Sequence, residues 1–106
     1  MNPIDRDFAD IEPTWLPSPN APRVFFKTLG TANAHLLQLL RLDAGGSLSI
    51  EPANQPRLLY VFDGELILCG RRLWRGAAEV IPAGSAAVDT RSEIGCTALY
   101  VRATAP

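Results

Sequence analysis

Apolar and polar residues alternate along the chain from Arg23 onward, and turn-forming residues interrupt the apolar stretches at short intervals. This spacing is typical of the many short strands of an all-β sandwich or barrel. The pattern predicts strands over residues 23–29, 34–42, 47–51, 57–62, 65–69, 72–74, 78–81, 86–89 and 95–102. We therefore expect a single all-β domain.

Glycine, proline and aspartate residues mark the predicted turns between these strands. Asp63-Gly64 is the strongest of these signals, because a type I′ hairpin turn needs two positive φ angles and Asp-Gly adopts them readily. The sequence therefore predicts a hairpin between the strands at 57–62 and 65–69. The other turn signals are Gly30, residues 43–46, Gly70, Gly76, residues 82–84 and Ser92.

Residues 35–42, HLLQLLRL, have a composition that would also suit a helix. The stretch is short, has no capping residue and is soon followed by two glycines, Gly45 and Gly46, so a strand is the better interpretation. We expect no long helix in the chain.

The first fifth of the chain, residues 1–22, is acidic and rich in proline. Proline fixes φ and removes a backbone donor, so we expect no regular helix and no central strand in this segment. Trp15 and Leu16 lie within it, and we expect them to pack on the body of the fold or on a second subunit. The predicted organisation is an N-terminal arm over 1–22 followed by a barrel domain over 23–106.

The chain has 106 residues and a formal net charge of −1, and its basic residues are spread along the sequence. It lacks the clustered positive charge that binds nucleic acid or anionic membranes, so neither is expected as a partner. Residues 1–22 lack the basic and apolar regions of a signal peptide, and no apolar run approaches the roughly 18 residues of a membrane span. We expect a cytoplasmic protein.

Four further side chains have structural interpretations. Cys69 and Cys96 are too few and too isolated for a disulfide framework or a C-x-x-C metal site, and we expect both to be buried free thiols. Glu65 and Glu79 match a strand-edge pattern of the family that the motifs below resemble, and this resemblance implies that both face solvent.

Glycines and prolines recur at fixed intervals inside the predicted barrel. One set of positions is Gly45, Glu51, Ala53, Arg57 and Gly64, and a second set is Gly76, Pro82, Gly84, Ala87 and Arg91. At these intervals, residues 23–102 resemble the cupin superfamily of jelly-roll barrels, whose motifs have the forms G-x5-H-x-H-x3-E-x6-G and G-x5-P-x-G-x2-H-x3-N. The glycines and the proline match these motifs, whereas every metal-ligand position is replaced.

Several short segments narrow the resemblance to one branch of the superfamily. K-T-L at 27–29, L-L-R-L-D-A-G at 39–45, P-A-G-S at 82–85 and R-S-E-I-G-C-T at 91–97 look like the ChrR-like cupins. That branch includes the C-terminal domain of an anti-sigma factor and an acetylacetone-cleaving dioxygenase. The resemblance implies strands around a central cavity and a homodimer built on one sheet. The anti-sigma relative also carries a helical zinc-binding domain, which residues 1–22 do not resemble, so we expect no sigma-factor partner.

The resemblance further implies a metal ion held at positions 51, 53, 57 and 87. A divalent transition ion needs several N, O or S donors at about 2.0 to 2.3 Å. These positions instead supply a carboxylate, two methyl groups and a guanidinium, and Arg57 has no lone pair to give and would repel a cation. We therefore expect no metal cofactor. Iron or zinc is the alternative, with Glu51 and His35 as the candidate ligands.

Glu51 and Arg57 flank one predicted turn, and the resemblance directs both side chains to the barrel interior, where they could form an ion pair in a polar pocket. Alternatively, one or both extend through the barrel mouth to solvent. A cavity that holds Arg57 and Arg91 among apolar side chains would suit a small carboxylate or enolate. The candidate cavity residues are Glu51, Ala53, Arg57, Leu59, Val61, Ala87 and Arg91.

Three functions are compatible with these features. A metal-free cupin that binds or senses a small, carboxylate-bearing ligand is the first, and the missing metal ligands favour it. The second is a structural domain whose barrel is packed shut and whose surface serves dimerisation. The third is an enzyme, either a metal-dependent dioxygenase with unusual ligands or a metal-free isomerase or lyase with Glu51 as its general base.

Overall fold

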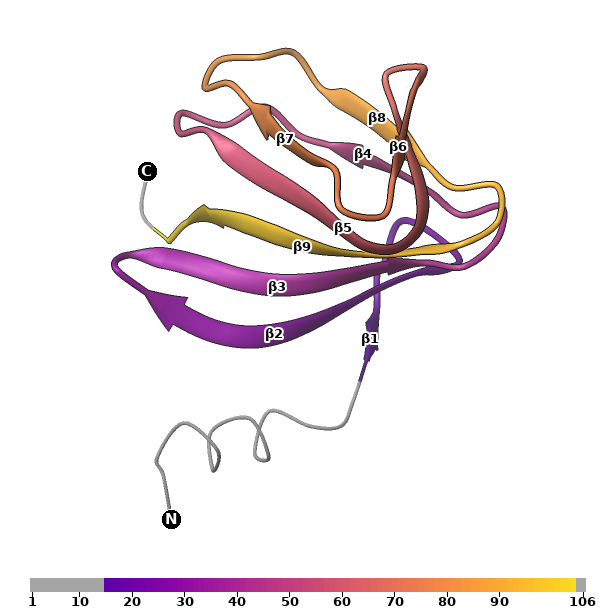
Figure 1. The fold of residues 1–106 in the computed structure, drawn as a ribbon. Coiled ribbons are helices and arrows are strands. Elements are labelled where there is room, and N and C mark those ends of the chain that lie inside the picture. The colour runs from indigo at the N-terminus through magenta and orange to yellow at the C-terminus, as the bar shows by residue number, and fades with distance from the viewer. Residues whose placement is uncertain (1–14, 105–106) are drawn as a thin grey trace.

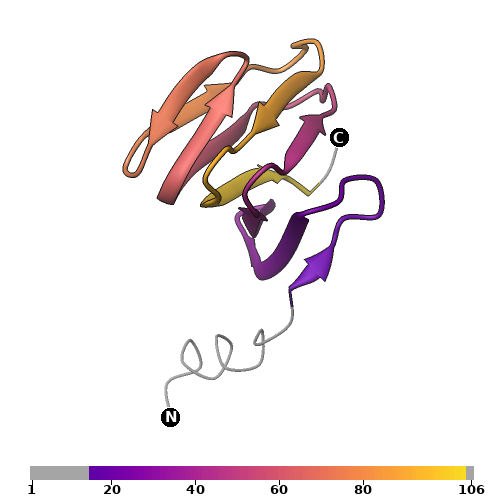
Figure 2. The ribbon, with the colours of Figure 1, turned by 90° about the vertical axis from the view of Figure 1, so that its right-hand side faces the viewer.

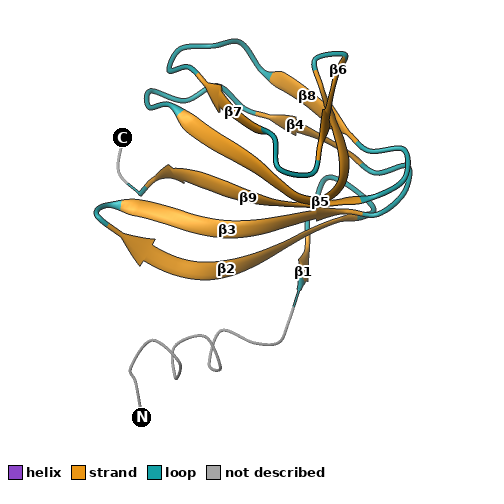
Figure 3. Cartoon of the chain, in the orientation of Figure 1, coloured by secondary structure: helices purple, strands orange, loops and turns teal. Residues whose placement is uncertain are grey.

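The computed structural model describes residues 15–104, and all of the regular secondary structure in this range is β (Figure 3). The strands are β1 (Leu16–Pro17), β2 (Val24–Ala32), β3 (His35–Leu42), β4 (Ser47–Ile50), β5 (Arg57–Leu68), β6 (Arg71–Trp74), β7 (Ala78–Ile81), β8 (Val88–Arg91) and β9 (Cys96–Ala103). The all-β prediction is confirmed, and residues 35–42 form a strand. Nothing between residues 15 and 104 forms a helix that could span a membrane.

The strands pair antiparallel in the order β1-β2-β3-β9-β5-β8-β4, and β6 and β7 pair with β5. Figures 1 and 2 show this sheet curled, so that β4 and β8 lie across from β2 and β3. The long strand β5 joins the two layers: its first half pairs with β7 and β9, and its second half pairs with β6 and β8. The result is a small jelly-roll barrel.

The predicted hairpin at Asp63-Gly64 is wrong, because β5 runs through these residues with a bulge between Val61 and Asp63. Gly64 has a φ of 77°, and a Cβ there would lie 2.0 Å from the carbonyl oxygen of Gly95. Because Gly64 has no side chain, β5 can pass close to the loop before β9. Glycine is favoured both at such close approaches and in hairpin turns, so the sequence signal is the same in the two cases. The nearby hairpin joins β5 to β6 instead, and both turn residues, Cys69 and Gly70, have positive φ.

The described part of the N-terminal arm lies against the edge of the sheet. Leu16 and Pro17 form β1, which pairs with β2 at the end of the strand order, an edge position that tolerates proline. The Trp15 ring lies 5.0 Å from the Arg41 guanidinium and 5.7 Å from the Lys27 ammonium. Trp15 therefore packs on the body of the fold, whereas Leu16 is exposed. The rest of the predicted arm, residues 1–14, lies outside the described residues.

One end of the barrel is filled with apolar side chains, and we call it the closed end. Leu42 lies opposite Cys96, and Leu40 lies opposite Ala98, which in turn lies opposite Val61 on β5. All five side chains are buried. Burial raises the pKa of the Cys96 thiol to about 11, so it remains protonated at neutral pH. Cys96 is thus a buried free thiol as expected.

Two expectations about exposed and buried side chains are wrong. Cys69 is exposed, because it forms the β5–β6 turn. Glu65, expected in solvent, is 0% exposed at the closed end, where the Glu93 amide donates to its carboxylate at 2.7 Å and Arg72 pairs with it at 2.8 Å. The burial of Glu65 comes from the loop between β8 and β9, whose Ser92 hydroxyl and Glu93 amide donate to its carboxylate. Glu79 is partly buried and pairs with Arg71.

We call the opposite end of the barrel the open end. The inward-facing positions of the strands are apolar at the closed end but include polar side chains at the open end. On β3, Gln38 faces inward like Leu40 and Leu42 but lies nearer the open end. On β9, Tyr100 and Arg102 continue the inward positions that begin with Ala98. Gln38 lies opposite Tyr100. The barrel is therefore polar and hollow at this end, where the start of β5 and the end of β9 lie (Figure 1).

Candidate functional site

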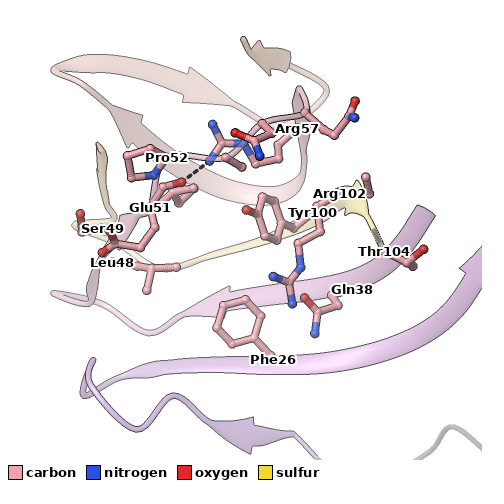
Figure 4. A pocket seen from close by; sticks show the side chains of 15 residues that line it. Phe26, Gln38, Leu48, Ser49, Glu51, Pro52, Arg57, Tyr100, Arg102 and Thr104 are labelled. Carbon is pink, nitrogen blue, oxygen red and sulfur yellow. Dashed lines mark hydrogen bonds between the residues drawn. The ribbon is translucent and has the colours of Figure 1, made fainter. Parts of the chain in front are cut away.

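The open end contains a pocket of about 550 Å³, a size typical of small-molecule sites. Its walls come from β2, β3, β4, β9 and the loop between β4 and β5 (Figure 4). Apolar surface comes from Phe26, Leu48 and Ile50. The polar and charged lining residues are Gln38, Ser49, Glu51, Asn54, Gln55, Arg57, Tyr100, Arg102 and Thr104. An apolar wall with a few polar groups is what a small organic ligand needs.

Arg57 begins β5 at the inner side of this pocket and is only 3% exposed. Its Nη1 donates to the main-chain carbonyl of Glu51, and its Nη2 donates to that of Pro82 at 3.5 Å. Its Nε is buried and has no hydrogen-bond partner. Of the two alternatives for these side chains, the ion pair with the Glu51 carboxylate is not formed, since no ion pair of Arg57 is present within residues 15–104. Arg57 instead uses the main-chain carbonyl of Glu51, and the exposed Glu51 side chain stays free of it.

Arg102 brings a second guanidinium to the same pocket from the end of β9. It is exposed, and within residues 15–104 no hydrogen bond or ion pair engages its side chain. Figure 4 shows the Arg102 side chain beside Tyr100 and reaching toward Gln38. Gln38 itself donates to the Thr28 hydroxyl at 3.2 Å, so its amide is held in place. The pocket thus contains one anchored arginine and one free arginine.

The structure places the predicted cavity residues in three different environments. Glu51, Ala53 and Arg57 line the pocket. Leu59 and Val61 are fully buried in the core instead. Ala87 and Arg91 are exposed outside the lining, and Arg91 lies 3.4 Å from the Glu93 carboxylate. The predicted cavity therefore coincides with the observed one only around the β4–β5 loop.

The sequence analysis missed Gln38, Tyr100 and Arg102 as pocket residues. A signal for them was available, because each continues the inward phase of a strand whose other inward residues are apolar. A polar residue in that phase near the end of a strand indicates that the barrel interior opens there.

The side chains do not fit the metal ion that the motif spacing would suggest. Of the four metal-ligand positions, Ala53 and Ala87 have no side-chain atom that could coordinate a metal, and Arg57 places a positive charge where the motif has a carboxylate. The His35 Nδ1 lies 2.9 Å from the Asn33 carbonyl oxygen, which makes Nδ1 the protonated nitrogen. Within residues 15–104, no three His, Cys, Asp or Glu side chains come together as a metal site. We therefore derive no chemistry through a metal.

Comparison with known proteins rests on structure, since no protein-family model and no curated protein matches the sequence. The polyketide cyclase RemF from Streptomyces resistomycificus superposes with a TM-score of 0.74 at 19% identity, over 92% of this chain and 77% of that one. The anti-sigma factor ChrR, solved with Rhodobacter sphaeroides SigE, gives 0.73 at 17% identity, over 85% of this chain and 48% of that one. Other solved structures with this architecture are cupins from Shewanella frigidimarina and Desulfitobacterium hafniense, so the chain has the cupin fold.

A third cupin-fold neighbour is an acetylacetone dioxygenase from Acinetobacter johnsonii, with a TM-score of 0.72 at 12% identity over 84% of this chain and 67% of that one. The resemblance to ChrR-like cupins is thus confirmed at the level of the fold. A cyclase, an anti-sigma factor and a dioxygenase share this fold, so the fold alone does not determine the activity. The function of this chain therefore depends on the residues of its own pocket.

Proposed function

We propose that this cupin is a metal-free module that binds a small carboxylate in the pocket at its open end. The observation that carries the proposal is Arg57, a nearly fully buried arginine that lines a pocket and has no carboxylate partner among residues 15–104. Burying an arginine without an anionic partner is costly, and a carboxylate from a ligand would offset that cost. The donor set at the pocket supports a binding role more than a metal-dependent one.

The hydrogen bonds of Arg57 leave part of its donor capacity unused. A guanidinium has five N–H donors, whereas Arg57 spends donors only on the carbonyls of Glu51 and Pro82, the latter at the long distance of 3.5 Å. The Nε group has no partner and is closed off from solvent. We expect the guanidinium to turn when a carboxylate enters, so that Nε and Nη2 form the paired hydrogen bonds that arginine makes with carboxylates.

An NMR titration with butyrate tests this proposal. Chemical-shift changes in ¹⁵N-labelled protein are expected around Phe26, Tyr100 and the β4–β5 loop. Arg57→Gln should weaken binding about tenfold or more, because it removes a charge-assisted pair. Arg75→Gln is the matched control: Arg75 is exposed and does not line the pocket, so its variant should bind butyrate normally. Equal affinity in both variants would overturn the proposal.

We also propose that the protein forms a homodimer through the outer face of the layer that β2, β3, β9 and the first half of β5 form. On this face, Leu39, Leu99 and Tyr60 lie in register across β3, β9 and β5, and no charged residue separates them. Phe62 and Val80 extend the same face and are 46% and 59% exposed. A contiguous apolar face of this kind is typical of protein–protein contacts.

Light scattering coupled to size-exclusion chromatography tests the dimer. The wild-type protein is expected to elute with twice its monomer mass, and Val80→Glu should shift it to monomer by placing a charge in the apolar contact. Arg75→Glu serves as a control for the added negative charge. A wild-type protein that is monomeric at high concentration would show this proposal to be wrong.

A further inference from the structure

We propose that the ligand of the pocket is a dicarboxylate, with one acid group bound by Arg57 and the other by Arg102. This inference rests on the proposed carboxylate-binding function and specifies its ligand class. Three observations support the dicarboxylate. They are the register of β5 and β9, the lack of anionic partners for these arginines within residues 15–104, and the directions of the two guanidinium groups.

The register places the two arginines at the same level of the barrel wall. Leu59 lies opposite Tyr100 and Leu58 lies opposite Val101, so the next step of the ladder brings Arg57 level with Arg102. Both residues line the pocket. Like charges at facing positions of neighbouring strands are destabilising, and the described part of the chain provides no carboxylate partner for either arginine. An anionic ligand would remove this repulsion.

Other arginines of the chain show what a structural arginine looks like in this fold. Arg41, Arg71, Arg72 and Arg91 each lie within ion-pair distance of an Asp or Glu side chain. The two pocket arginines differ from these four, since within residues 15–104 neither has an acidic partner. Arg23 and Arg75 also have no acidic partner in this range, but neither of them lines the pocket. The acidic groups that they lack are best supplied by the ligand.

The guanidinium groups diverge, although the two arginines leave the sheet at one level. Figure 4 shows Arg57 directed toward Glu51 and Pro52, whereas Arg102 reaches past Tyr100 toward Gln38 and Phe26. Two charges that point to different sides of one pocket suit two separated acid groups better than a single doubly charged group. The ring of Tyr100 between them offers a surface for a short apolar spacer.

The test compares dicarboxylates with monocarboxylates of the same chain length: succinate with butyrate, glutarate with pentanoate and adipate with hexanoate. Titration calorimetry or NMR measures each affinity, and inorganic phosphate is tested alongside. At least one dicarboxylate is expected to bind about tenfold or more tightly than its monocarboxylate, because it makes a second charge-assisted contact. Arg102→Gln should abolish this advantage, whereas Arg57→Gln should weaken the binding of both members of each pair.

The variants are chosen so that the two proposals can fail separately. Arg102 is exposed, so its replacement is expected to leave the fold intact, as far-UV circular dichroism will show, and Arg75→Gln controls for the lost charge. If monocarboxylates bind through Arg57 but dicarboxylates bind no more tightly, or if the advantage survives Arg102→Gln, the dicarboxylate inference is wrong and carboxylate binding stands. Phosphate binding that needs both arginines, without dicarboxylate binding, would also overturn it. If no carboxylate binds, both proposals are wrong.

Discussion

Each end of the barrel buries a charged side chain, but the two charges differ in their partners. At the closed end, the carboxylate of Glu65 accepts hydrogen bonds from the Glu93 amide and the Ser92 hydroxyl and pairs with Arg72. At the open end, the guanidinium of Arg57 contacts only main-chain carbonyls, and its Nε has no partner. A buried charge whose partners are all supplied by the fold stabilises that fold, whereas one left incomplete beside a pocket is available to a ligand.

The largest expected effect comes from breaking the closed-end network. Glu65→Ala should lower the free energy of unfolding by about 3 kcal/mol, because it leaves buried donors without an acceptor. Urea denaturation measures this loss. Glu79→Ala is the matched control, since Glu79 also pairs with an arginine of β6 but is partly exposed; its loss should be about 1 kcal/mol or less. Equal losses in the two variants would show that burial does not distinguish these pairs.

The same carboxylate should make stability depend on acid pH. Burial by itself raises the pKa of Glu65, but the hydrogen bonds from Glu93, Ser92 and Ile94, together with the charge of Arg72, outweigh it and hold the pKa below 4.5. A folded-state pKa that is lowered adds stability above the unfolded value, and this stability is lost as pH falls through the folded value. We expect the stability gap between wild type and Glu65→Ala to be full at pH 7 and to narrow below about pH 4.5. A gap that stays constant down to pH 2 would contradict this assignment.

Arg57 should contribute little to stability, although it is as deeply buried as Glu65. Arg57→Met is expected to change the free energy of unfolding by about 1 kcal/mol or less, because an apolar side chain avoids the cost of burying the charge. The carbonyls of Glu51 and Pro82 belong to exposed residues, where water can replace the guanidinium. Urea denaturation measures the change alongside Glu65→Ala. A loss as large as that of Glu65→Ala would make Arg57 a structural residue and remove the contrast between the two ends.

The sequence pattern predicts the strands well and fails where one residue changes the phase. Alternation and turn residues place strands close to their observed bounds, because each strand buries one face and is interrupted by a true turn residue. Gly64 carries the same signal as a hairpin glycine but serves a close contact with Gly95. The burial of Glu65 depends on where the loop between β8 and β9 places Ser92 and Glu93, which no alternation pattern specifies.

The pocket was predicted in part, for a related reason. The motif spacing indicated positions 51, 53, 57, 87 and 91 as cavity residues. Positions 51, 53 and 57 line the pocket, whereas positions 87 and 91 do not. A spacing motif marks the positions of metal ligands in a family. Gln38 and Arg102, the pocket residues that were not predicted, lie on strands outside the motifs. The side-chain partners of Arg57 depend on where the β4–β5 loop places its carbonyls, which no sequence pattern specifies.

The smallest expected effect concerns Glu51, the acidic side chain that residues 15–104 contribute to the pocket lining. Because it is exposed and carries a charge of the same sign as a carboxylate ligand, Glu51→Gln should strengthen succinate binding about twofold to threefold at low ionic strength and less at high salt. Asp63→Asn is the control, since Asp63 is an exposed acid outside the lining. The sign of the effect separates the functions: repulsion predicts a gain, whereas a Glu51 that held a metal or acted as general base would lose binding or turnover when replaced. A loss would therefore reopen the enzyme alternative, and a gain would leave the two arginines as the groups that select the ligand.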